Sequence, residues 1–374
     1  MIGERIKMAR HMKGLSQRAL GEASGVSAMA ISKYENGHDM PSSGVLVRLA
    51  KALGIKTEFF LRPVGPELKA MAFRCRLSMP RKQEQKLTGQ VREWVERYME
   101  AESLLPSRIE FRKRLPVDMN RFAEKLEDIE GIAVNLRNHW GLGLDPVESM
   151  IDILEDRGVK IGLFEACREF DACTFYADED PVIALKDKLP GDRQFFNLAH
   201  ELGHLLMLLG DGIDEEKAAH RFAGAFLVPR ELVYEELGHK RHALNLNELY
   251  LLKRKYKLSM QAWVYRAKDL GIIGSGFYMA FFKYFRSNDF DKREPFDQIE
   301  PDKPKRMEKI ILHLLAEEVI SESKAVELLG SSYVDVATGI REIAPSSLKS
   351  AKDIFSPSQY AGLFWPLTDE ETVK

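Results

Sequence analysis

The chain has 374 residues, a hydrophobic content of 45% and a formal net charge of −2, which favour two or three ordinary globular domains. No apolar run approaches the roughly 18 residues that cross a bilayer, and the N-terminus lacks the apolar core of a signal peptide. Three cysteines are too few for a disulfide framework. We therefore expect a cytoplasmic protein with no membrane partner.

The charge is unevenly distributed along the chain. Residues 1–63 carry ten Lys or Arg and five Asp or Glu, which gives this segment a charge of +5 and leaves −7 for the remainder. A small basic domain attached to an acidic body indicates double-stranded DNA as the partner of the N-terminal segment.

Short helical patterns separated by glycine turns fill residues 1–63. Ser16 and Ser27 are placed to cap the second and third helices, and Gly25 lies in the turn between them. A helix, a tight glycine turn and a second helix form the helix-turn-helix plan. The five expected helices lie near residues 6–13, 17–23, 28–34, 45–53 and 57–61.

Residues 15–37 read LSQRALGEASGVSAMAISKYENG and resemble the XRE (lambda-repressor-like) family. The resemblance implies a DNA-binding domain over 1–63 whose third helix enters the major groove. Lys33 offers a strong donor, Ala28 and Met29 can contact thymine methyls, and the second helix would reach the DNA backbone. The alternative is a protein–protein module of the same fold. The expected DNA-binding residues are Ser16, Gln17, Ser27, Ala28, Met29, Ser32 and Lys33. A homodimer is a candidate assembly that would multiply a modest specificity.

A linker and connecting helix are expected over residues 64–118. Proline and glycine break the segment 64–81, and a helix follows at about 82–104. We expect further helices at about 119–138 and 145–156. Three short strands are then predicted at 159–164, 172–176 and 182–185. An edge strand of such a sheet, 172–176 or 182–185, can bind a substrate backbone by strand addition.

The segment 195–207 reads FFNLAHELGHLLM and predicts a buried helix. Its histidines, His200 and His204, are four positions apart on one helical face and can reach one metal ion. Glu201 lies beside them as the candidate general base. Two histidine ligands and a glutamate base are the zinc-peptidase arrangement.

A zinc site of this kind needs a third protein ligand and an open fourth position. A second helix is predicted over 214–228, and Pro229 ends it. Glu216 is the expected third ligand, and His220, one turn later, is placed to orient Glu216 or His200. Two alternatives stay open: His220 or Glu215 could be the ligand instead.

These two helices resemble the ImmA/IrrE family of metallopeptidases. The second reads ExxAHRFAxxFLVP from Glu216, with His220 where the family usually has Asn. The resemblance implies a minimal zincin domain over 119–240 that binds Zn²⁺. It also implies a metalloendopeptidase, active as made or latent until activated. The expected substrate is a repressor-type protein or the chain itself, in a stress or mobile-element response. The alternative is a non-enzymatic transcription factor whose zincin-like domain is structural or senses a ligand.

Helical patterns continue over residues 241–340, and a C-terminal tail is expected at 341–374. Residues 244–270 hold two helices with a basic run, 253–257, and form a candidate second helix-turn-helix. Packing alone is the alternative reading of that pair. The expected fold is therefore multidomain and mainly α, with an N-terminal helix-turn-helix domain, a central α+β zincin domain with a small sheet, and a C-terminal helical region.

Overall fold

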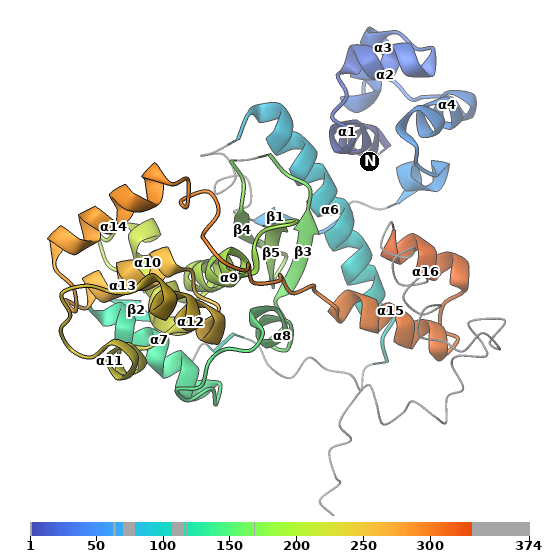
Figure 1. Ribbon diagram of the computed structural model, residues 1–374. Coiled ribbons are helices and arrows are strands. Elements are labelled where there is room, and N and C mark those ends of the chain that lie inside the picture. The colour runs from blue at the N-terminus through green and yellow to red at the C-terminus, as the bar shows by residue number, and fades with distance from the viewer. Residues whose placement is uncertain are drawn as a thin grey trace, which may run out of the picture. The chain divides into compact units, whose positions relative to one another are not determined.

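The computed structural model describes residues 2–62, 65–69, 79–106, 115–116, 119–167 and 169–330. The described chain is mainly helical with a small sheet, which confirms the expected fold class (Figure 1). It divides into two compact units, Met1–Arg92 with Phe111–Pro304, and Glu93–Glu110 with Lys305–Lys374. The expected tail at 341–374 lies outside the described residues. No helix among the described residues is both long enough and apolar enough to cross a membrane.

The five N-terminal helices predicted from the sequence are present. They are α1 (Ile2–Met12), α2 (Gln17–Ser24), α3 (Ala28–Glu35), α4 (Ser43–Leu53) and the 3₁₀ helix η1 (Thr57–Leu61). The Ser16 hydroxyl accepts a hydrogen bond from the N–H of Ala19, and Ser27 accepts one from Ala30, so both predicted caps form. Gly25 ends α2 in the left-handed region, with φ 67°. The helices enclose a core of their own, which includes Ile6, Leu20, Ile31, Leu49, Leu53 and Phe60.

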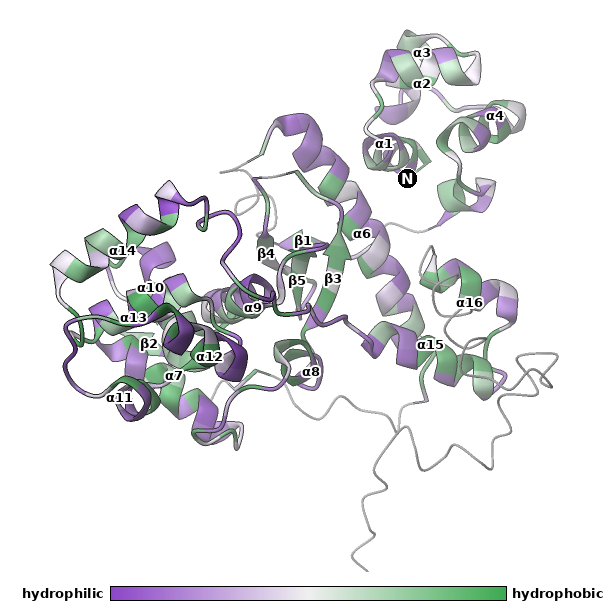
Figure 2. Cartoon of the chain, viewed as in Figure 1, coloured by the Kyte–Doolittle hydropathy of each residue, from purple (hydrophilic) through white to green (hydrophobic). Residues whose placement is uncertain are grey.

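The three predicted strands form and a fourth joins them. The sheet has the order β1 (Leu68–Lys69), β4 (Ala172–Ala177), β5 (Asp180–Lys186), β3 (Lys160–Phe164). Strand β5 runs parallel to β3 and antiparallel to β4, and β1 pairs antiparallel with β4. Strands β4 and β5 each pair with two neighbours, so the suggestion that 172–176 or 182–185 forms an edge was wrong for both. The inner strands are mostly apolar in Figure 2, as expected for a sheet with buried faces.

Two of the expected helices begin later than the sequence suggested. Residues Phe122–Ala123 form strand β2, which pairs in parallel with β6 (Leu208–Leu209), and helix α7 spans Asp128–His139. Asp128 accepts backbone N–H bonds from Glu124 and Lys125, which closes a turn before the helix starts. Helix α8 covers Met150–Glu155, because the Ser149 hydroxyl caps it by accepting from Asp152.

Helices pack around the sheet and around each other in the first unit. The remaining helices of this unit are α9 (Gly191–Leu206), α10 (Glu215–Leu227), α11 (Arg230–Leu237), α12 (Leu246–Tyr256), α13 (Met260–Asp269) and α14 (Ser275–Ser287). Helix α9 packs against β4, β5 and α10, and α10 also packs against α7. One continuous apolar core runs from α7 and the strands through α9 and α10 to α13 and α14.

The second unit is a small helical assembly. It holds the C-terminal part of α6 (Arg81–Ser103) with α15 (Arg306–Ala316) and α16 (Glu322–Leu329). Arg97 donates to the carbonyl of Leu328 at 2.8 Å, and Lys324 forms an ion pair with Glu100 at 2.6 Å. These contacts attach the C-terminal helices to α6.

Candidate metal centre and nucleic-acid interface

Helices α9 and α10 approach closely because small and apolar residues line their contact. Leu198 and Leu202 on α9, and Phe222 and Phe226 on α10, are fully buried. Gly203 allows the approach, since a Cβ there would lie 3.1 Å from the Phe222 ring. The close packing brings the polar faces of the two helices together at their solvent side.

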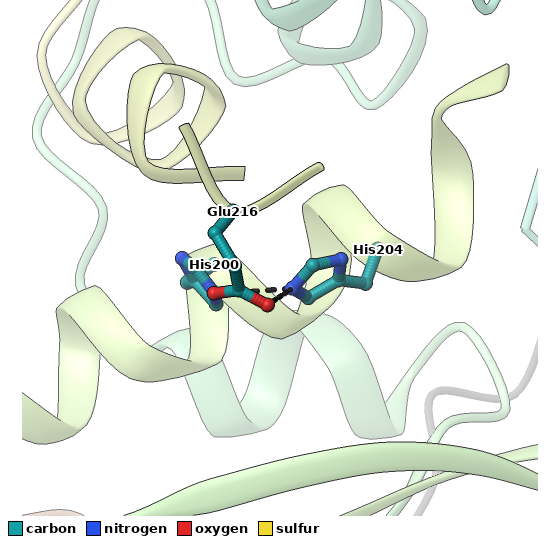
Figure 3. A group of neighbouring side chains, drawn as sticks. All are labelled: His200, His204 and Glu216. Carbon is teal, nitrogen blue, oxygen red and sulfur yellow. Dashed lines mark hydrogen bonds and ion pairs between the residues drawn. The ribbon is translucent and has the colours of Figure 1, made fainter. Parts of the chain in front are cut away.

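His200, His204 and Glu216 meet at that point (Figure 3). The Nε2 atoms of the two histidines are 3.1 Å apart. Glu216 places Oε2 3.2 Å from Nε2 of His200, and Oε1 3.4 Å from Nε2 of His204. The histidine side chains are 12% and 4% exposed, whereas that of Glu216 is 68% exposed, so the group is open to solvent on its acidic side.

The spacing of these donors fits one metal ion. Ligand bonds of about 2.0–2.1 Å in a tetrahedral site place neighbouring ligand atoms about 3.3 Å apart. The two imidazole nitrogens are 3.1 Å apart, and each lies 3.2–3.4 Å from one oxygen of the Glu216 carboxylate, so these separations are close to that spacing. Two imidazoles and one carboxylate are also the donor set of many catalytic zinc sites. The residues fit a zinc ion with one position left open.

Glu215 and His220, the two alternative ligands, lie outside this group of donors. Glu215 places Oε1 3.1 Å from Nδ1 of His204, the ring nitrogen that points away from the other donors. The His220 ring packs edge-on against His200 with its centroid at 4.6 Å, and against Phe196 at 5.5 Å. Glu215 therefore contacts His204 at hydrogen-bond distance, whereas His220 contacts His200 by ring packing.

Glu201 is 6% exposed and follows His200 on α9. A buried carboxylate needs a bonding partner, and Glu201 has one in the structure. Its place in the helix is the one expected for a general base.

Buried charged side chains contact the two helices outside the site. Lys253 on α12 contacts Asp192 near the start of α9 at 2.8 Å and Glu294 at 2.9 Å. Burial by itself would lower the pKa of Lys253, but Glu294 and Asp192 outweigh it and raise that pKa. At the other end, Arg137 donates to the carbonyl of Phe226 on α10 at 2.7 Å. Arg137 is almost fully buried, and desolvation lowers its pKa.

The basic run 253–257 is engaged within the chain. Lys255 pairs with Glu236 at 2.6 Å, and Arg254 donates to the Tyr250 hydroxyl at 3.3 Å. Lys257 bonds the carbonyl of Glu148 and lies over the Phe195 ring. Helices α12 and α13 form as predicted, and these contacts favour the packing reading of 244–270 over a second DNA-binding surface.

The candidate DNA contacts lie on and beside α3. Ser27, Ala28, Met29 and Lys33 are exposed, with Met29 71% exposed, and Ser32 is half-buried. Ser16 is also exposed. Gln17 is half-buried and donates to Glu35 Oε2 at 2.8 Å, while Arg10 forms a bidentate pair with the same carboxylate at 2.6 and 2.8 Å. That buried network, which the sequence did not reveal, ties α1 and α2 to the end of α3 and so orients the exposed helix.

The N-terminal fold and the donor cluster together define a helix-turn-helix domain joined to a domain with a zinc-peptidase-like site. Comparison with known proteins agrees. Residues 6–60 match the helix-turn-helix family, and residues 164–268 match the family described as IrrE N-terminal-like domain. The chain thus carries an XRE-type helix-turn-helix domain followed by an IrrE/ImmA-like peptidase domain.

Similar individual proteins are matched only over the first domain. An SPbeta prophage-derived uncharacterized HTH-type transcriptional regulator, YonR of Bacillus subtilis, is 37% identical over 62 residues, which are 17% of this chain and 57% of that protein. The uncharacterized HTH-type transcriptional regulator y4wC of Sinorhizobium fredii is 37% identical over 59 residues, 16% of this chain and 41% of that protein. The chain therefore spans about half the length of the curated relatives it matches.

Among solved structures, ComR from Streptococcus suis aligns over 91% of this chain and 89% of its own, at 12% identity and a TM-score of 0.16. That score is too low to compare the two folds.

Proposed function

We propose that this protein is a DNA-binding transcriptional regulator whose second domain is a zinc-dependent endopeptidase. The observation that supports the peptidase most directly is the triangle of His200, His204 and Glu216, with ligand spacing suited to zinc and Glu201 beside it. The double-stranded DNA partner is supported by the basic charge of residues 1–63 and by the exposed face of α3.

The proposed chemistry assigns each residue of the site a separate task. His200, His204 and Glu216 would hold Zn²⁺, which lowers the pKa of a water molecule to about 7 and polarises the scissile carbonyl. Glu201 takes the proton of the attacking water and passes it to the leaving amine. Glu215 and His220 keep the two imidazoles in their orientation.

The proposed substrate is a repressor-type protein or the chain itself. The fusion of a repressor-like domain to a peptidase domain supports this, because cleavage between them would release the DNA-binding domain. The prophage origin in the name of the Bacillus subtilis relative supports a role linked to mobile elements. A homodimer on DNA and a role in a stress response remain part of the same proposal.

A second candidate is a transcription factor that uses the zincin-like domain without catalysis. The curated relatives favour it, since both are named as transcriptional regulators. The two proposed functions predict opposite effects of one substitution at Glu201. Glu201→Gln should abolish regulation of transcription if peptide cleavage drives it. It should leave regulation intact if the zincin-like domain is structural or senses a ligand.

The decisive first measurement is the zinc content per chain by elemental mass spectrometry. We expect near-stoichiometric zinc in the wild type, retention in His220→Ala, and loss in His204→Ala and Glu216→Ala. A wild type that binds no zinc even after reconstitution would refute the peptidase and leave the DNA-binding regulator.

A further inference from the structure

The linker that follows the DNA-binding domain in the sequence contributes a strand to the sheet of the peptidase-like domain. Leu68 pairs with Ala177 and Lys69 with Tyr176, so β1 covers the outer edge of β4. Asp178 donates its backbone N–H to the carbonyl of Glu67 at 3.0 Å, which continues the ladder by one residue. Without β1, strand β4 would be an edge of this sheet, and β4 is also one of the two strands that α9 packs against.

An open sheet edge is a binding site for an extended peptide. Such a peptide adds as a further strand, with backbone hydrogen bonds for affinity and alternate side chains for specificity. Strand β4 belongs to the sheet that supports α9, the helix that carries His200 and His204. We propose that the outer edge of β4 receives the backbone of a peptide substrate, and that residues 67–69 of the linker occupy this edge and must leave before a substrate binds. This inference rests on the proposed peptidase function.

The contacts of β1 suit an occupant that can be displaced. The strand is two residues long, and its ion pair, Lys69 with Glu179 at 3.2 Å, joins side chains that are 49% and 88% exposed. Exposed ion pairs add little to stability. The Glu67 N–H also donates to the Asp178 carboxylate at 3.1 Å, and Arg92 donates to the carbonyl of the adjoining Pro66 at 3.4 Å.

The strand is also directly connected to the DNA-binding domain. Only residues 62–67 separate the end of η1 at Leu61 from Leu68. Any event that pulls on or reorients the DNA-binding domain therefore acts on β1 through a short tether. A substrate strand and the linker strand compete for one edge, so occupation of the edge by the linker lowers the apparent affinity for the substrate.

The ladder geometry offers a reversible lock. Because Asp178 bonds Glu67, the neighbouring pair Leu68 and Ala177 is non-hydrogen-bonded, a type with Cα atoms about 4.5 Å apart. That separation lies within the range of about 4.4–6.8 Å for disulfides. Leu68→Cys with Ala177→Cys, in a chain with Cys75, Cys167 and Cys173 replaced, should form a disulfide that holds β1 in place and opens on reduction.

The test measures peptide binding rather than turnover. The probe is a fluorescent synthetic peptide of residues 64–72, VGPELKAMA, titrated into the full chain carrying Glu201→Gln. Lys69→Pro removes a ladder N–H and weakens β1. We expect the Lys69→Pro chain to bind the probe at least 10-fold more tightly than the chain with the unaltered linker. Lys69→Ala removes only the exposed ion pair and should stay within about 2-fold.

The disulfide variant tests the opposite case, in which β1 cannot leave the edge. We expect its oxidised form to bind the probe at least 10-fold more weakly than its reduced form, with the same circular dichroism spectrum in both. Equal binding by the two forms, or no binding by any variant, would overturn the proposal. None of these binding measurements needs catalysis. A chain without peptidase activity would therefore refute the peptidase function, but the binding measurements would still test the competition for the β4 edge.

Discussion

Glu215 Oε1 lies 3.1 Å from Nδ1 of His204, while Nε2 of the same ring faces His200 and Glu216. In the proposed zinc site, this carboxylate would accept the Nδ1 proton of His204 and leave Nε2 free to bind the metal. Carboxylate partners of this kind also raise the basicity of the ligand.

We predict that Glu215→Gln weakens zinc affinity by about 10–100-fold without abolishing binding. Competition with a chromophoric chelator measures the affinity, and Glu231→Gln on α11 is a matched control that removes an exposed carboxylate elsewhere. Complete loss of zinc in Glu215→Gln would instead make Glu215 a ligand, which is the alternative that the sequence left open.

Lys33 is the one strong donor on the exposed face of α3, and its loss should weaken DNA binding. If it contacts a phosphate, Lys33→Ala should reduce the slope of log affinity against log salt by about 0.9. Fluorescence anisotropy with a genomic operator fragment at several salt concentrations gives both quantities. Lys283→Ala on α14 makes the same change of charge outside the domain, and an equal loss in both variants would contradict a direct contact.

Gly21 lies on α2 where the chain turns back towards α3. A Cβ at this position would lie 2.5 Å from the Val26 carbonyl oxygen and 3.2 Å from the Ala28 nitrogen, so the turn itself would have to shift. We predict that Gly21→Ala destabilises the DNA-binding domain by about 1–3 kcal/mol.

Gly44 on α4 provides the control, because a Cβ there meets no atom within 4 Å. Alanine is the better helix former, so Gly44→Ala should be neutral or stabilising by about 0.5–1 kcal/mol. Thermal unfolding followed by circular dichroism compares the two variants. A Gly21→Ala protein as stable as the wild type would show that the turn is not as tight as described.

The buried pair of Glu130 on α7 and Arg266 on α13 fixes the end of α10. Arg266 donates to Glu130 Oε2 at 2.9 Å and to the carbonyl of Val228 at 3.2 Å. Glu130→Ala would remove the carboxylate that bonds the buried guanidinium, and Asp269 at 3.7 Å is too distant to replace it, so we predict a loss of about 3–5 kcal/mol. Denaturation followed by tryptophan fluorescence measures it.

A double variant separates the destabilisation caused by an unpaired buried charge from the stability that the ion pair itself contributes. Glu130→Met with Arg266→Met should recover most of the lost stability, because no buried charge remains. Glu22→Ala breaks the exposed pair with Arg18, whose side chains are 67% and 85% exposed, and should change stability by less than about 1 kcal/mol. A double variant as unstable as Glu130→Ala would mean that the hydrogen bonds of the pair with the backbone of Val228 and Arg230 matter more than the charge.

The sequence by itself determined the local features of both domains. Serine caps, glycine turns and helical periodicity located the five N-terminal helices, because each of these signals acts within a few residues. The four-residue spacing of His200 and His204 placed both rings on one face of α9 for the same reason. The helix period also selected Glu216 on α10, and the structure brings it within 3.4 Å of both imidazole nitrogens.

Only the tertiary structure decided how segments far apart in the chain meet. Strand β1 is too short to show an alternating pattern, and its pairing with β4 joins residues more than 100 positions apart. The starts of α7 and α8 moved because Phe122 pairs with Leu208 and because Ser149 supplies a cap. Glu215 and Glu216 are adjacent acids on one helix, and only the packing of α10 on α9 determined which of them joins the two histidines and which one supports His204.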